Sequence, residues 1–220
     1  MTDLSPASSE DTRLFAFPSA RLALGSFVSA LFLSSLFGVV YGGADYLTAM
    51  RTKHVRIDFS FEQNIPFIPE LSPVYSSLYV LFLFVPFVLR STQQLRSYVF
   101  AMTAMTLVAG VCFLLISARL GFVSPPVDQV LPFSFRIADQ LNLTYNPCPS
   151  LHAAYAVFHA QIFGCRARQP WLFHLWAFAI AAAAWFTHQH HLVDLLAGAL
   201  LGISGGAVYN SLCRRTAPHR

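Results

Sequence analysis

Long apolar runs dominate the 220-residue chain and limit what it can fold into. Each run is continuous, without the alternation of apolar and polar residues that membrane β-strands show. A helix needs about 20 apolar residues to cross a bilayer. Charged residues make up 11% of the chain, against about 25% in soluble domains. We therefore predict an all-α integral membrane protein with six transmembrane helices, over residues 21–41, 74–90, 97–118, 150–165, 170–187 and 191–212.

The six runs leave little of the chain for a separate catalytic module. Residues 1–20 contain Asp3, Glu10 and Asp11 where a signal peptide would carry positive charge, so we expect a disordered cytoplasmic tail there. Residues 21–212 form the membrane domain, and residues 213–220 are expected to be a second cytoplasmic tail.

Basic residues indicate the orientation of the helices. With six crossings both termini lie on one side, and the loops of that side carry arginines with few acidic residues: Arg13, Arg21, Arg90, Arg96, Arg166, Arg168, Arg214, Arg215 and Arg220. The positive-inside rule makes this side cytoplasmic. We expect a multi-pass protein of the plasma (inner) membrane, with the loops around 42–73, 119–149 and 187–190 outside.

The net charge of +4 does not indicate a nucleic-acid partner, because the basic residues are scattered as singles and pairs. The partner that the composition predicts is the lipid bilayer, while the oligomeric state is left open. The first outer loop, "RIDFSFEQNIPFIPELSP", mixes aromatic residues, acids and prolines. It could lie on the membrane surface or cap a site, or it could be a simple connector.

Two polar stretches fall at the same predicted membrane face. They are "NPCPSLHAAYA", from Asn146 to Ala156, and "THQHHLVDLLAG", from Thr187 to Gly198. Ionisable residues at the ends of membrane helices are costly to desolvate and often mark a functional site. His190 and Asp194 are four residues apart, so in a helix the carboxylate would share a face with the ring and could orient it.

The earlier stretch has the features of a helix start. Pro147 and Pro149 are tolerated before or at the first turn, and Ser150 is a typical N-cap residue. The N–H groups of a first helical turn, together with the Ser150 hydroxyl, favour binding of an anion such as phosphate. His152 would point into that position.

Metal binding is the alternative reading of these stretches. His152, His188, His190, His191 and Asp194 are all competent ligands. Their spacing differs from that of an H-E-x-x-H helix, and the adjacent His190 and His191 would point to different faces. No metal site is predicted.

Taken together, "PSLHAAYA" and "HHLVDLLAG" resemble the paired motifs of the type-2 phosphatidic acid phosphatase superfamily, which are Pro-Ser-Gly-His and Ser-Arg-x5-His-x3-Asp. The resemblance covers these motifs and the six-helix layout. The chain departs from it in three ways: the upstream Lys-x6-Arg-Pro motif is absent, Ala183 and Ala184 replace Ser-Arg, and Leu151 replaces the glycine. In these respects it is more similar to the inositol-phosphorylceramide synthase and sphingomyelin synthase branch.

The resemblance implies a hydrolase or transferase of lipid metabolism that acts on a lipid phosphate or phospholipid at the extracytoplasmic face. By residue-to-residue correspondence, His190 is the nucleophile that forms a phosphohistidine, Asp194 orients it, and His152 exchanges a proton with the leaving or attacking oxygen. Phosphate binding is assigned to Ser150, with His188, Arg119 and Arg136 as candidate sources of positive charge. No cofactor or metal is implied. The competing hypothesis is a lipid-binding or scrambling protein of the same architecture without turnover.

Overall fold

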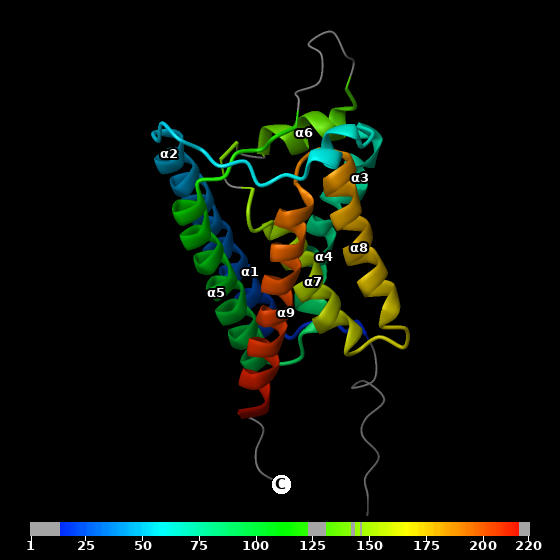
Figure 1. The fold of residues 1–220 in the computed structure, drawn as a ribbon. Coiled ribbons are helices and arrows are strands. Elements are labelled where there is room, and N and C mark those ends of the chain that lie inside the picture. The colour runs from blue at the N-terminus through cyan, green and yellow to red at the C-terminus, as the bar shows by residue number, and fades with distance from the viewer. Residues whose placement is uncertain (1–13, 123–130, 142–143, 146, 216–220) are drawn as a thin grey trace, which may run out of the picture.

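A computed structural model describes residues 14–122, 131–141, 144–145 and 147–215. These residues form helices and one isolated β-bridge, between Val55 and Ala118 (Figure 1). The α-helices are α1 (Ala20–Phe37), α2 (Gly43–Ala49), α3 (Ser72–Ser76), α4 (Leu78–Val88), α5 (Thr92–Ile116), α6 (Phe133–Leu141), α7 (Leu151–Gly164), α8 (Trp171–Phe186) and α9 (Leu192–Arg215). A π-helical turn, η1 (Gly38–Gly42), joins α1 to α2, and η2 (Ser60–Asn64) and η3 (Pro69–Leu71) are short 3₁₀ helices.

The prediction of an all-α membrane protein is confirmed in its main features. Four helical stretches are long and apolar enough to cross a membrane: Ala20–Ala49, Pro69–Val88, Thr92–Ile116 and Leu192–Arg215. The other two predicted spans are helical but shorter, since α8 has 16 residues and α7 has 14.

Several predicted boundaries differ from the structure. The first helical stretch continues to Ala49, past its predicted end at residue 41, and the third begins at Thr92 where residue 97 was predicted. Residues 119–149 were expected to be loop, but α6 forms within them as an amphipathic helix, with Phe135 and Ala138 buried and Arg136 exposed. The last helix continues to Arg215, past the predicted end at residue 212, and its last turn contains Arg214 and Arg215, whose positive charges interact favourably with the C-terminal end of the helix dipole. The remaining tail predictions, residues 1–13 and 216–220, lie outside the described residues.

The helices run between two ends of the bundle (Figure 1). At one end Ala16 N–H donates to the carbonyl of Phe87 (2.9 Å), and Arg166 donates to the side chain of Gln94 (3.2 Å). The start of α1, the α4–α5 turn and the α7–α8 turn therefore lie together there. The other end, called the α6 end below, holds α3, α6 and the first turns of α7 and α9 (Figure 1).

Helix α7 is the centre of the bundle, with eleven of its fourteen residues buried. Its one deep polar residue is satisfied: His159 Nδ1 donates to the carbonyl of Tyr155 (2.7 Å), so Nε2 accepts from the Tyr98 hydroxyl (3.0 Å). His159 is thus a packed, hydrogen-bonded helix residue.

Glycines bring α9 unusually close to α7. Gly198, Gly202 and Gly206 repeat every fourth residue and so lie on one face of α9. A Cβ atom at Gly198 would overlap the carbonyl oxygen of Ser150, and one at Gly202 would overlap that of Ala154. Small residues permit this kind of close helix packing in membranes. The contact aligns the first turn of α7 with the first turn of α9.

We predict that Gly202→Ala destabilises the protein by about 1–3 kcal/mol, because the methyl group has no room against the α7 backbone. The sign is diagnostic, since alanine in place of glycine normally stabilises a helix by up to ~1 kcal/mol. Gly43→Ala is the matched control, because nothing lies within 4 Å of a Cβ at that position. Thermal unfolding in detergent measures both variants. A Gly202→Ala protein as stable as Gly43→Ala would contradict the close contact.

Candidate active site

The first turn of α7 forms as the sequence predicts. Ser150 is the N-cap residue, and its Oγ accepts from the Ala153 N–H at 3.2 Å. The Ser150 side chain is fully buried. The first-turn N–H groups of a helix have no partner within the helix, and here they lie at the α6 end of the bundle.

The second motif has a different local structure from the predicted one. His190 and Asp194 were expected on one face of a helix, but α9 begins only at Leu192, so His190 lies in the turn that follows α8. The N–H groups of Gln189 and His190 donate to the carbonyl of Ala184 (2.9 and 3.2 Å), which closes this turn. His188, with φ of +57°, supplies the left-handed residue that the turn requires.

Asp194 connects the two motifs through its carboxylate and its backbone. Oδ2 accepts from the His191 N–H at 2.8 Å, which caps the first turn of α9, while the backbone carbonyl accepts from Ser150 N–H at 2.9 Å. Oδ2 also lies 3.8 Å from His190 Nδ1. Oδ1 is buried and has no hydrogen-bond partner among the described residues. Asp194 therefore faces His190 as predicted, through a turn and at more than hydrogen-bond distance.

His152 and His190 come together in this region. Their ring centroids are 6.2 Å apart. His152 Nδ1 pairs with the Tyr75 hydroxyl at 3.0 Å, and the two rings stack at 4.1 Å. His152 Nε2 and His190 Nδ1 are buried without a hydrogen-bond partner in the described part of the chain. Such unpartnered polar atoms are rare in folded proteins and are candidates for binding a ligand.

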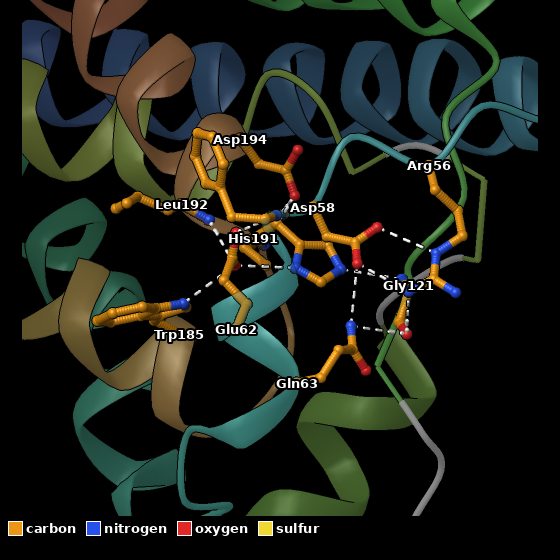
Figure 2. Close-up of polar contacts among 11 residues, drawn as sticks. Arg56, Asp58, Glu62, Gln63, Gly121, Trp185, His191, Leu192 and Asp194 are labelled. Carbon is orange, nitrogen blue, oxygen red and sulfur yellow. Dashed lines mark hydrogen bonds and ion pairs between the residues drawn. The ribbon is translucent and has the colours of Figure 1, made fainter.

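A buried carboxylate, Glu62, holds the second motif in place (Figure 2). It comes from η2, in the loop between α2 and α3 that the basic residues predict to be the first outer loop, and it is fully buried. Its Oε2 accepts from His191 Nδ1 (2.9 Å), Leu192 N–H (3.1 Å) and Trp185 Nε1 (3.2 Å). Its Oε1 accepts from Phe59 N–H (2.9 Å). Burial alone would raise the pKa of Glu62, but these donors outweigh it and the pKa lies below its ordinary value.

The network also assigns the tautomer of His191. Gly121 N–H donates to His191 Nε2 at 2.9 Å, and a backbone N–H can only donate. His191 Nε2 is therefore the acceptor, and Nδ1 carries the proton that it donates to Glu62. With both ring nitrogens occupied, His191 is a structural residue, and His190 is the histidine of this pair available for chemistry.

A second group of contacts fastens the first outer loop to residue 121. Arg56 and Gln63 both donate to Asp58 and to the Gly121 carbonyl (Figure 2). The Arg56 guanidinium lowers the pKa of Asp58 to about 2. Of the alternatives open for this loop, the structure favours capping, because η2 covers the second motif through Glu62.

The remaining predicted phosphate-binding residues are less closely associated with the two histidines. Burial lowers the pKa of His188, so this ring is neutral near pH 7, and it stacks on Phe122 with ring centroids 4.1 Å apart. Arg119 and Arg136 are exposed, and the Arg136 guanidinium lies 5.8 Å from the centroid of the Phe133 ring. The lowered pKa of His188 argues against its predicted role as a source of charge, but its Nε2, like His152 Nε2 and His190 Nδ1, is buried without a hydrogen-bond partner among the described residues.

Two residues of the site were missed from the sequence. In the sequence, Glu62 is one acidic residue in a loop rich in aromatic residues. It lies more than 100 residues from His191, so no local pattern predicts that the two side chains pair. Tyr75 gave no signal, because a tyrosine at the start of a membrane helix resembles an ordinary interfacial aromatic residue. Comparison with protein-family models, curated proteins and solved structures gives no match to this chain.

We predict that Glu62→Gln lowers the free energy of unfolding by about 1–3 kcal/mol, because the amide NH₂ would face donors that now point at a carboxylate oxygen. Glu70→Gln is the matched control, since Glu70 lies at the other end of the same loop and is exposed. Thermal unfolding in detergent gives the comparison. Equal stability of the two variants would show that the hydrogen bonds of Glu62 contribute nothing to the free energy of unfolding.

The contribution of Glu62 should also depend on pH. Its folded-state pKa is depressed below the ordinary value of 4.5, so its stabilisation is complete above that pH and is lost as the pH falls through the lower folded-state value. The difference in unfolding free energy between wild type and Glu62→Gln should therefore be constant from pH 7 to about 5 and shrink at more acidic pH. A difference that grows on acidification would contradict this assignment.

Proposed function

We propose that the chain is a membrane-embedded lipid phosphoesterase or phosphotransferase that works through a phosphohistidine on His190. The observation that supports this most directly is the convergence of His152 and His190 from distant parts of the chain, with His152 Nε2 buried and unpartnered and His190 Nδ1 directed toward Asp194. Ring centroids 6.2 Å apart bring the two imidazoles close enough to act on the same phosphoryl group.

His190 would attack phosphorus, forming a P–N bond as the P–O bond to the leaving group breaks. Asp194 would orient the ring and stabilise its positive charge. Their separation of 3.8 Å is longer than a hydrogen bond, but such contacts commonly tighten when substrate binds. The oxygens of phosphorus would lie near the first turn of α7, whose N–H groups favour developing negative charge.

His152 would transfer the proton in both steps. In the first, Nε2–H protonates the departing oxygen. In the second, Nε2 accepts a proton from water or a lipid alcohol, whose oxygen attacks phosphorus as the P–N bond breaks. Tyr75 suits this exchange because a phenol can donate to Nδ1 or accept from it. Both protonation patterns of His152 therefore keep their hydrogen bond.

The choice between hydrolysis and transfer rests on charge. A phosphomonoester carries close to two negative charges near neutral pH and a diester carries one, so a site without a close cation favours the diester. The absence of the Lys-x6-Arg-Pro and Ser-Arg motifs from the sequence and the lowered pKa of His188 agree with this preference. We propose an extracytoplasmic site and a lipid phosphate or phospholipid substrate, with water or a lipid alcohol as acceptor.

A trapping experiment tests the mechanism. We predict that an activated phosphate ester, whose leaving group needs no protonation, labels His152→Gln with an acid-labile, base-stable phosphoryl group, because only the second step then lacks its base. Turnover by this variant should fall about 10²–10⁴-fold. His190→Ala should take no label, and His174→Gln, changed at an exposed histidine of α8, should behave as wild type.

Mass spectrometry under alkaline conditions identifies the labelled residue. A phosphoryl group on His190 supports the proposal. Labelling of His191, or labelling that persists in His190→Ala, would contradict the assigned nucleophile. A further outcome is that neither wild type nor any variant takes label or turns over a panel of lipid phosphates and phospholipids. That result would favour the competing hypothesis of a lipid-binding or scrambling protein without turnover.

A further inference from the structure

A large apolar cavity extends from His152 into the bundle. Its volume is about 730 Å³, and α1, α4, α5 and α7 line it. Along α1 the lining begins at Pro18 and ends at Phe37, so the cavity follows that helix for nearly its whole length. The volume is in the range of small-molecule sites, about 300–1,000 Å³.

The chemistry of the lining changes along the cavity. Among the described residues, no side chain that lines the cavity is Asp, Glu, Lys or Arg, and most are aliphatic or aromatic, with a few serine hydroxyls on α1. At the α6 end the cavity reaches the candidate site, because His152 lines it there, beside the Tyr79 ring. A ligand that fits this pattern has a polar head at His152 and an apolar body along α1.

The cavity is also open to its surroundings. Phe27, Tyr79 and Leu83 line it and yet have 62, 47 and 71% of their surface exposed. In a membrane these side chains face lipid, so an apolar chain can enter sideways without crossing water. His190 and Asp194, by contrast, are almost completely buried, and α6 and η2 cover their end of the bundle.

We propose that this cavity binds one hydrocarbon chain of the lipid substrate, with the phosphoester at His152 and the chain extending along α1 toward Ala23. The inference rests on the proposed function, because it takes His152 as the catalytic end. It adds that the substrate is an amphiphile with at least one long unbranched or isoprenoid chain, and that the depth of the cavity limits the length of chain accepted.

Two small residues at different depths allow the limit to be measured. Ala30 and Ala23 both line the cavity and are separated by seven residues, or about 10 Å of helix. A tryptophan at Ala30 would close the cavity near its middle, while one at Ala23 would close only its far end. Val28 does not line the cavity and is 56% exposed, so Val28→Trp adds the same bulk to the outside of α1.

The probe is a series of alkyl phosphates of increasing length, each with a photoreactive diazirine at the chain end. In wild type the longest probe should label residues at the far end of the cavity, such as Phe87 and Leu95. Ala30→Trp should reduce labelling by long chains about tenfold or more and retain short ones, because every excluded methylene loses its burial. Ala23→Trp should exclude only the longest chains, and Val28→Trp should match wild type.

Comparing the chain-length pattern with the phosphohistidine trap separates the two proposals. If wild type shows the chain-length pattern while His152→Gln takes no phosphoryl group on His190, the cavity assignment stands and the catalytic mechanism falls. Equal labelling of wild type and Ala30→Trp at every length would overturn the cavity assignment. So would labels confined to the outer face of α1, at Leu24, Val28 and Leu31, because that pattern is the one expected of surrounding lipid.

Discussion

The backbone contact between α7 and α9 is the constraint on which the rest of the site depends. Ser150 N–H donates to the carbonyl of Asp194, and Gly198 leaves space for the Ser150 carbonyl beside it. Backbone atoms can approach this closely only where a side chain is missing. The contact places the start of the His152 helix against the start of the Asp194 helix, and so brings two short motifs to one end of the bundle.

Burial of Glu62 is the second requirement. A carboxylate in an apolar bundle is costly unless its oxygens are fully hydrogen-bonded, and Glu62 meets that condition with four donors. These donors come from its own loop, from α8 and from the start of α9. One side chain therefore fixes the first outer loop over the turn that carries His190. It also occupies His191, which leaves the two adjacent histidines with different roles.

His152 belongs to both the candidate site and the apolar cavity, so the two are continuous. The polar groups are concentrated at the covered α6 end, whereas the apolar volume opens sideways along α1. An amphiphile would place each part in a matching environment: a phosphoester beside the imidazoles and the first turn of α7, and a hydrocarbon chain between α1 and α4.

Local patterns in the sequence determined the helices and the residue types of the site. The apolar runs locate the membrane helices because hydrophobic length is a local property, although the first helical stretch continues past its predicted end at residue 41 to Ala49. Ser150 was recognisable as an N-cap because capping chemistry involves only the next three residues. Asp194 and His190 were recognisable as a pair by spacing, although they meet through a turn that closes on Ala184, which the helical spacing does not describe.

Tertiary structure decided everything that depends on contacts between distant segments. Glu62 pairs with His191, Tyr75 pairs with His152, and Gly121 N–H selects the His191 tautomer, each across dozens of residues or more. The amphipathic α6 and the exposed positions of Arg119 and Arg136 also follow from how the outer segments pack at their end of the bundle. The sequence alone determined which helices and reactive groups the chain has, because those depend on neighbours along the chain. Which groups meet, and which nitrogen of each histidine is left for chemistry, depended on neighbours in space.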